Sequence, residues 1–363
     1  MKIAVLGFTK VKYMTYMHFY LNQIDLGKNE VHLIYWLRDH NPDSEIPEGV
    51  TGHAFDCPMS DAIPLTKKLP KIFRFGEFAK KKIKEINPDF LIVLHSTTAI
   101  SIYSLLNGKY KKKYIFDYRD VTYEGKSFYR KMVGKIVKNS VLCFTSSDGF
   151  RKFLPEDATI LNSHNISNTE FHDEVKVAYS PEKHTPIRIA FWGLIRNRKV
   201  NEGIIEKLGN DPRFELHYYG RAQGGILTLM EESQEKYSNV FFHGEYAPTD
   251  RMQMAQNTDI IHNMFDSSDK TMPIAMSNKY YDGPLFLLPQ LCTRGSHMGK
   301  LCTKAGIGFE CDPADEDFSD KVYKYYMGLD AEIFANNCEK ELCRVLDEVE
   351  KGNRMIKEAL GNA

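Results

Sequence analysis

The feature that most constrains the fold of this chain is the alternation of short apolar runs with longer, helix-compatible segments. In the first half, five runs have the length and apolar content of β-strands, namely KIAVLGF, EVHLIYWL, DFLIVLHS, KYIFDY and SVLCFTS. The helix-compatible segments cover residues 14–26, 68–86, 98–106, 127–139 and 147–154. Continuous apolar runs of this length are typical of parallel strands that are buried on both faces. The pattern therefore predicts an α/β fold in which helices cover both faces of a parallel sheet.

A second series of the same kind follows a polar segment that contains two prolines. This segment, AYSPEKHTP at 178–186, is predicted to be a linker. The strands expected after it are IRIAFWG, FELHYYG, NVFFHG, DIIHNMF, PLFLLP and GIGFEC. A last segment, from about 331 to 360, has helical periodicity. We expect two doubly wound, Rossmann-like domains, at 1–177 and 187–340, and a C-terminal helix at 341–363. Residues 40–66 are expected to form loops.

The composition excludes several classes of protein. The 363 residues include 48 basic and 48 acidic side chains, and no nucleic-acid-binding module is recognisable, so no nucleic-acid partner is expected. Seven scattered cysteines lack metal-site spacing and indicate reduced thiols in a cytoplasmic protein. The sequence has neither a secretory signal pattern at MKIAVLGF nor an apolar run of about 18 residues. A membrane span is therefore not expected, although peripheral attachment stays open.

Glycines and cations follow the predicted strands of the second series. The first strand ends at Gly193, and the loop after it contains Arg196, Arg198 and Lys199. The next strand ends at Gly220 in YYGRAQGG, and the strand after that ends in another glycine. Glycine allows backbone to approach a ligand closely, and cations at the end of a strand can neutralise a diphosphate. An ordinary solvated basic loop would have the same residues.

The segment SNKYYDG is predicted to begin a helix near Ser277. Ser277 and Asn278 are good capping residues, and Lys279 adds a positive charge where the helix dipole already attracts anions. Asp282 lies within about one turn, and its carboxylate can accept hydrogen bonds from the vicinal hydroxyls of a ribose. These residues predict a site for a nucleoside diphosphate, while a capped helix with a solvent-facing acid remains the alternative.

The order of these motifs, GLIRNRKVNEGIIEKL, YYGRAQG, NVFFHGEY, DIIHNMFD, SNKYYDG and GIGFECDP, resembles the donor lobe of GT-B glycosyltransferases, in particular glycosyltransferase family 4. The resemblance implies two Rossmann-like domains that face a central cleft, and a final helix that returns toward the first lobe. It implies that Lys199 and a neighbouring arginine hold the donor diphosphate without a metal or cofactor, and that Asp282 holds the ribose. Many family members also have an acid eight residues before this position. Here that position is Ile274.

The first lobe is expected to bind the acceptor. Gly7 ends the first strand, and Lys10 and Tyr13 follow it in a loop. Arg119 and Asp120 end the strand KYIFDY, where Asp120 is a candidate to position an acceptor hydroxyl or to act as a base. An aspartate that caps a turn is the alternative. His95, at the end of another strand, is interpreted as structural.

The first lobe also has a basic surface. Residues 60–152 contain 20 basic and 8 acidic side chains, and the run KKLPKIFRFGEFAKKKIK interleaves cations with aromatic residues. Such a run can lie on an anionic membrane, and it can equally form a solvated helix that packs on the sheet.

The sequence as a whole predicts a glycosyltransferase that moves a sugar from a nucleoside diphosphate to a hydroxyl of a glycan or lipid-linked glycan, at or near the inner membrane face. The resemblance to family 4 implies that the reaction retains the anomeric configuration and that its setting is surface polysaccharide synthesis. A nucleotide-sugar epimerase or hydrolase, and a non-catalytic nucleotide-sugar-binding protein, are the alternatives.

Overall fold

The computed structural model describes residues 1–42, 45–60, 63–166, 183, 185–266 and 272–361. The chain divides into two units. Unit 1 consists of Met1–Asn165 and Asp347–Ala363, and unit 2 consists of Ile166–Leu346. Most of the predicted linker at 178–186 lies outside the described residues.

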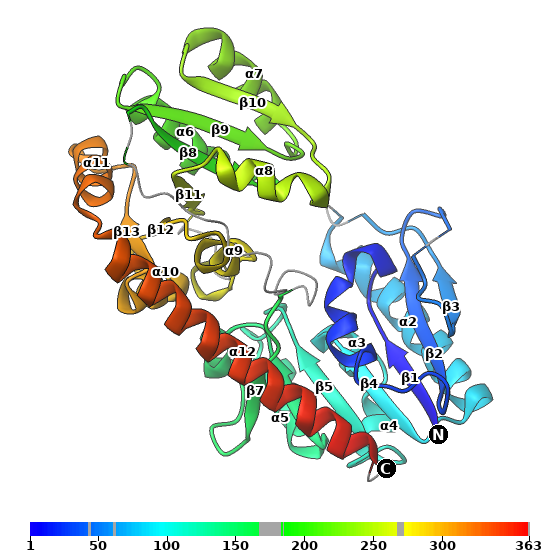
Figure 1. The fold of residues 1–363 in the computed structure, drawn as a ribbon. Helices are drawn as coiled ribbons and strands as arrows, with labels where there is room; N and C mark the ends of the chain where they lie inside the picture. Colours follow the sequence, from blue (N-terminus) through cyan, green and yellow to red (C-terminus); the bar gives the residue numbers. More distant parts are fainter. Residues whose placement is uncertain (43–44, 61–62, 167–182, 184, 267–271, 362–363) are drawn as a thin grey trace. The chain divides into compact units, whose positions relative to one another are not determined.

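Unit 1 contains a parallel sheet of seven strands in the order β3-β2-β1-β4-β5-β6-β7 (Figure 1). The strands are β1 (Lys2–Leu6), β2 (Glu30–Leu37), β3 (Val50–Asp56), β4 (Phe90–Leu94), β5 (Tyr114–Tyr118), β6 (Leu142–Thr145) and β7 (Ile160–Asn162). Its helices are α1 (His18–Leu21), α2 (Leu65–Ile86), α3 (Ser96–Ser101), α4 (Tyr103–Asn107) and α5 (Ser127–Asn139), with 3-10 turns η1 (Val11–Tyr13), η2 (Thr15–Met17) and η3 (Asp148–Phe153).

Unit 2 repeats this architecture with a parallel sheet of six strands in the order β10-β9-β8-β11-β12-β13. The strands are β8 (Ile187–Trp192), β9 (Phe214–Tyr219), β10 (Val240–Gly244), β11 (Ile260–Asn263), β12 (Gln290–Thr293) and β13 (Gly308–Cys311). Its helices are α6 (Arg198–Leu208), α7 (Ile226–Lys236), α8 (Arg251–Gln256), α9 (Lys279–Phe286), α10 (His297–Ala305) and α11 (Phe318–Gly328), with 3-10 turns η5 (Pro248–Asp250) and η6 (Met272–Ile274). The two-sheet α/β architecture predicted from the alternating runs is confirmed.

The last helix, α12 (Ala331–Gly361, red in Figure 1), contributes to the cores of both units. Phe334 and Cys338, near its start, belong to a buried cluster of unit 2. Ile356 and Leu360, near its end, belong to the main core of unit 1. Apolar residues at helical spacing along its whole length thus stabilise both units.

Continuous apolar runs predicted the central strands well. All of β2 after Glu30 is buried, which is why EVHLIYWL contains no polar alternation. Two strands at the edges of the sheet were missed. β3 falls in the segment expected to be loop, and its residues are mostly exposed or half-buried. β7 has only three residues. Strands with little buried surface do not need the apolar run that identifies a central strand.

The prediction that PLFLLP forms a strand is wrong. Its first three residues end α9, which is buried on all sides from Tyr280 to Phe286, and the strand begins only at Gln290. A short helix that is buried on every face has no apolar periodicity, so its sequence cannot be distinguished from that of a buried strand. The chain leaves α9 at Leu287, which adopts a left-handed conformation with φ of 54°.

Candidate functional site

The strand orders place a topological switch point in each unit. In unit 2, β8 has β9 on one side and β11 on the other, and in unit 1, β1 has β2 on one side and β4 on the other. In each sheet the chain adds strands first on one side of the central strand and then on its other side. Open α/β sheets bind ligands outside the carboxyl ends of the strands at such points. Of the site residues predicted from the sequence, Gly193 and the cations after it follow β8, Gly220 follows β9, and Gly7 follows β1.

Three glycine turns meet at the carboxyl edge of the sheet in unit 2. The Gly193 N–H donates to the Tyr219 carbonyl at 3.0 Å, and the Gly220 N–H donates to the Gly244 carbonyl at 2.6 Å. Gly193 and Gly220 have φ of 120° and 130°. A Cβ on Gly220 would lie 1.8 Å from the Gly193 carbonyl oxygen. Only glycine allows these two turns to approach so closely, and the backbone carries no side chain at these two positions.

Lys279, at the start of α9, directs its ammonium toward the first of these turns. Its Nζ donates to the Trp192 carbonyl at 3.3 Å and lies 4.2 Å from the centre of the Phe191 ring. Burial lowers the pKa of Lys279 to about 8, with a further lowering by Arg196 that Asp282 opposes. A cation with a depressed pKa beside a glycine turn is suited to bind an anion, because an anion restores the charged form.

A buried polar chain, not identified from the sequence, supports the cationic loop. His262, at the end of β11, accepts the Met264 N–H at Nδ1 over 3.2 Å, so its Nε2 carries the hydrogen that is donated to Asn201 Oδ1 at 3.2 Å. Asn201 in turn donates to the Arg196 carbonyl at 2.9 Å. Burial, together with Lys279, lowers the pKa of His262 to about 3. The signal in the sequence that could have identified His262 is its position at the end of an apolar run.

Asp282 is buried, with 4% of its surface exposed. Its Oδ2 accepts the indole N–H of Trp192 at 2.7 Å, and its Oδ1 forms an ion pair with Arg251. Burial raises the pKa of Asp282, and the Arg251 guanidinium opposes that effect. The alternative of a solvent-facing acid is therefore wrong. Both carboxylate oxygens of Asp282 therefore stabilise contacts within unit 2, one to Trp192 and one to Arg251. A contact between Asp282 and a ribose stays a prediction.

The other donor residues predicted from the sequence lie around the same edge. Ser277 accepts the Lys279 N–H at 3.3 Å, and Asn278 is the cap of α9, which begins two residues later than expected. Arg198 donates to the Gly225 carbonyl at 2.8 Å and to Glu202 at 2.5 Å, so it links the start of α6 to the residue before α7. Arg196 precedes α6, and Lys199 is exposed in its first turn.

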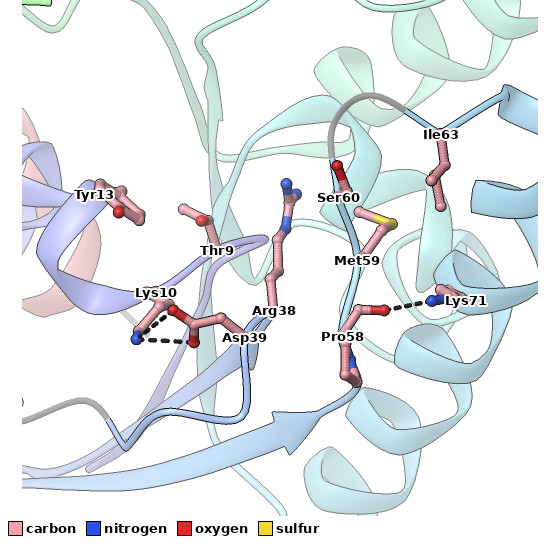
Figure 2. A pocket seen from close by; sticks show the side chains of 10 residues that line it. All are labelled: Thr9, Lys10, Tyr13, Arg38, Asp39, Pro58, Met59, Ser60, Ile63 and Lys71. Atoms are coloured by element: carbon pink, nitrogen blue, oxygen red, sulfur yellow. Dashed lines mark hydrogen bonds and ion pairs between the residues drawn. The ribbon is translucent and has the colours of Figure 1, made fainter. Parts of the chain in front are cut away.

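In unit 1, the ends of β1, β2 and β3 surround a pocket of about 600 Å³ (Figure 2). Two predicted acceptor residues, Lys10 and Tyr13, line it. Lys10 is buried and forms an ion pair with Asp39 at 3.0 Å, whereas Tyr13 is exposed. Gly7 does not line the pocket. A Cβ at Gly7 would meet the Met14 sulfur at 2.1 Å, so this glycine permits a close internal contact.

Arg119 does not have the exposure expected of a residue that contacts an acceptor. It is buried, its NH1 donates to Asp117 at 3.2 Å and to Ser163 at 3.3 Å, and its guanidinium packs 3.9 Å from the centre of the Tyr16 ring. These contacts neutralise the buried Asp117. The structure thus corrects the sequence-based assignment, and Arg119 supports the sheet from within.

Asp120 is exposed, with its Oδ2 lying 3.7 Å from His95 Nε2. His95 has φ of 80°, accepts the Thr97 N–H at Nδ1 over 3.1 Å, and stacks on Phe8. This fixes the tautomer with hydrogen on Nε2, so the imidazole presents a donor toward Asp120. Burial lowers the pKa of His95, and Asp120 opposes the effect. His95 is the N-cap of α3, which agrees with its interpretation as a structural histidine. It also lies beside Asp120.

Within the part of the chain that the structure describes, no three histidine, cysteine or acidic side chains are arranged to hold a metal ion. No helix among these residues is long and apolar enough to cross a membrane.

No protein-family model matches the chain, and no curated protein sequence matches it. Solved structures do match over the full length. Sucrose-phosphate synthase from Thermosynechococcus elongatus has a TM-score of 0.70 at 11% identity, covering 99% of this chain and 97% of its own. The lipopolysaccharide outer core galactosyltransferase WaaB has a TM-score of 0.66 at 14% identity, covering 100% and 99%. The chain has the GT-B fold.

A third GT-B structure, with a similar TM-score, contains bound ligands. HepE from Anabaena, solved in complex with UDP and glucose, has a TM-score of 0.64 at 13% identity, and each chain is covered completely. The same protein is also solved with UDP-glucose. Identities at this level show a common GT-B fold, and function must be argued from the residues of this chain.

Proposed function

We propose that this chain is a glycosyltransferase that moves a hexosyl group from a nucleoside diphosphate to a hydroxyl of a glycan acceptor. The observation that carries the proposal is the Lys279 ammonium, which lies beside the Gly193 turn at the switch point of unit 2. A phosphate can approach such an edge closely because the glycine positions carry no side chain, and the Lys279 ammonium lies beside them. The nucleoside diphosphate is the group that unit 2 would bind.

The reaction breaks the bond between the anomeric carbon and the diphosphate oxygen and forms a bond from that carbon to the acceptor oxygen. Lys279, with Arg196 and Lys199 from the loop after β8, would stabilise the negative charge that develops on the departing diphosphate. The hydroxyl proton of the acceptor leaves with the diphosphate in a retaining reaction, or goes to Asp120 if that residue is a base. We propose that the proton leaves with the diphosphate, because the resemblance to family 4 implies a retaining reaction. Neither course requires a metal.

The similar structures support the choice of donor. HepE binds UDP and UDP-glucose, and WaaB is a galactosyltransferase of the lipopolysaccharide outer core. We extend these properties to this chain as a proposal. The donor would be a uridine diphosphate sugar, and the product a surface polysaccharide made in the cytoplasm.

Peripheral contact with a membrane is proposed for the first turns of α2. Leu65, Leu69 and Phe73 are exposed at helical spacing, and 71% of the surface of Phe73 is accessible. The same turns of α2 contain four basic residues, Lys67, Lys68, Lys71 and Arg74. Apolar side chains beside cations suit an anionic lipid surface. Replacement Phe73→Ser should weaken binding to phosphatidylglycerol vesicles without a change in thermal stability, and equal binding by both proteins would contradict this part of the proposal.

A non-catalytic nucleotide-sugar-binding protein is the second candidate. The specific observation in its favour is Ile274, which stands where many family members have an acid and cannot bind a sugar hydroxyl. A protein of this kind would bind the nucleotide sugar without turnover toward any acceptor.

The decisive experiment is calorimetric titration of the protein with UDP, GDP, ADP and their sugars. Lys279→Met and Lys199→Ala should each weaken binding of the preferred diphosphate about tenfold or more, since charge-assisted contacts contribute roughly 1.5 to 3 kcal/mol. Lys304→Ala is the matched control, because Lys304 is exposed in the last turn of α10, at the opposite edge of the sheet. If no nucleotide binds, or if only the control loses affinity, the proposal is wrong.

A further inference from the structure

We propose that two histidine pairs, one in each sheet, bind divalent transition-metal ions such as Zn²⁺ and Ni²⁺. Each pair joins the second strand of its unit to the edge strand beside it, β2 to β3 and β9 to β10 (Figure 1). The inference is separate from the proposed function, because none of these residues belongs to the donor or acceptor residues described above. The residues are Glu30, His32 and His53 in unit 1 and Glu215, His217 and His243 in unit 2.

In unit 1, the pair lies on one face of β2 and β3. Glu30 and His32 are two residues apart on β2, so their side chains share a face of the strand. The strand register places His32 opposite Thr51, and His53 follows two residues later on the same face. His32 Nδ1 lies 3.0 Å from His53 Nε2, and His32 Nε2 lies 2.9 Å from the Glu30 carboxylate. His32 thus connects a carboxylate to a second imidazole.

The same arrangement recurs in unit 2. Glu215 and His217 are two residues apart on β9, and the register places His217 opposite Phe241, two residues before His243. The ladder becomes irregular at His243, whose side chain is exposed. His217 Nδ1 lies 3.1 Å from His243 Nε2, and His217 Nε2 lies 3.4 Å from the Glu215 carboxylate. Two separate strand pairs therefore contain the same three residue types at the same spacing.

The carboxylate behind each pair fixes the tautomer of the first histidine. An ionised carboxylate only accepts hydrogen bonds, so His32 and His217 carry hydrogen on Nε2 and have a lone pair on Nδ1. An outer carboxylate orients metal-ligating histidines in the same way. Without a metal, Nε2 of the second histidine donates its hydrogen to that lone pair. A metal ion would take the place of this hydrogen, and the second histidine would then carry its hydrogen on Nδ1.

The separation of the two nitrogens fits one metal ion. With Zn–N bonds of about 2.0 to 2.1 Å, two nitrogens at right-angle or tetrahedral positions around one ion are about 2.9 to 3.4 Å apart. The observed distances of 3.0 and 3.1 Å lie within this range. Imidazole nitrogens suit Zn²⁺, Ni²⁺ and Cu²⁺, and water would complete the coordination.

The cations close to the two pairs are themselves held by acids. Lys82, beside the pair of unit 1, forms an ion pair with Glu85 at 2.7 Å. Arg188, beside the pair of unit 2, forms an ion pair with Asp259 at 2.9 Å. These ion pairs reduce the repulsion of a divalent cation, and the carboxylate behind each histidine pair attracts it.

The test is calorimetric titration of the full, untagged chain with Ni²⁺ and with Zn²⁺ in a buffer that does not coordinate metals. All proteins carry Cys343→Ser, because the exposed Cys343 thiol can also bind these ions. We expect the parent to bind two equivalents of metal. His53→Gln and His243→Gln should each remove one equivalent, and the double variant should remove both. His40→Gln is the matched control and should still bind two equivalents, because His40 pairs with Asp56 at 2.7 Å rather than with a histidine.

A second measurement uses the unsubstituted pairs and so does not depend on the folding of the histidine variants. NMR of the imidazole nitrogens with Zn²⁺ should report ligation through Nδ1 of the first histidine and Nε2 of the second histidine in each pair. Glu215→Gln should weaken metal binding at its own pair about tenfold or more and leave the pair of unit 1 unchanged. Absence of metal binding in the parent, or two equivalents bound by the double variant, would overturn the inference. A pair whose variant still binds two equivalents is not a metal site.

Discussion

At the scale of single residues, Lys279 and Asp282 show how two neighbouring positions of one short segment have different surroundings. They lie one helical turn apart in α9, yet the lysine faces the glycine turns while the aspartate is buried against Trp192 and Arg251. The sequence alone predicts that both residues bind the nucleoside diphosphate. Their different surroundings lead to different predictions.

Nucleotide affinity should depend on the charge of Lys279. Because the pKa of Lys279 is lowered to about 8, the free protein loses this charge as pH rises through 8. A bound diphosphate raises the pKa toward its ordinary value, so binding takes up a proton above pH 8. We expect UDP affinity to fall by up to about tenfold between pH 7 and pH 9. Calorimetry across this range measures it, and Lys279→Arg should bind with no such pH dependence. A parent protein whose affinity stays constant would rule out Lys279 as the titrating contact.

Removal of the Asp282 carboxylate should destabilise unit 2 whether or not a nucleotide binds. Asp282→Ala leaves the Arg251 guanidinium and the Trp192 N–H without their buried acceptor. Breaking a buried ion pair on one side costs about 3 to 5 kcal/mol. Urea denaturation at pH 7 measures the loss, with the exposed Asp317→Ala as control. A loss below about 1 kcal/mol would mean that the carboxylate is not structurally required, and would favour a role in ligand binding alone.

At the scale of elements, the turns after β8 and β9 are fitted to each other. Their approach leaves no space for a Cβ at Gly220, whose φ of 130° also disfavours other residues. By contrast, Gly224, four residues later, has φ of 63° and nothing within 4 Å of a hypothetical Cβ. These two glycines therefore make a matched pair.

Gly220→Ala should displace both turns and weaken nucleotide binding. We expect a loss of about 2 kcal/mol or more in the free energy of unfolding, since the clash is with backbone. Gly224→Ala should cost about 1 kcal/mol, because only its positive φ is disfavoured. Denaturation curves and UDP titrations of both variants provide the measurement. Similar effects at the two positions would contradict the steric explanation.

At the scale of the whole molecule, the chain builds one architecture twice and ends in a helix that stabilises both units. The C-terminal segment Asp347–Ala363 belongs to unit 1, although unit 2 precedes it in the sequence. Within unit 1, Gly352 lies where a Cβ would approach Phe19 and Phe144 at 3.0 and 3.2 Å. The stability of the first unit therefore depends on the last residues of the chain.

Ile356→Ala should destabilise unit 1 by about 2 to 4 kcal/mol, because Ile356 is fully buried in its core and the change leaves a cavity. Lys357→Ala, at the exposed neighbouring position, should change stability by less than about 0.5 kcal/mol. Hydrogen exchange of the strands in unit 1 measures the effect locally. Equal protection of β1 and β2 in the two variants would show that the helix end does not stabilise unit 1.

The sequence by itself determined the α/β class, the central strands and the glycine-terminated edge of unit 2. Local signals were sufficient there, because a strand buried on both faces needs a continuous apolar run, as in EVHLIYWL. Only the tertiary structure decided that PLF belongs to a helix, that β3 extends the sheet, and that Arg119 and Asp282 face inward. It also brought His262 to Asn201, and Arg38 to Lys10 and Lys71. These outcomes depend on packing between segments far apart in the sequence. Burial and charge pairing belong to the assembled sheet and cannot be read from any one segment of it.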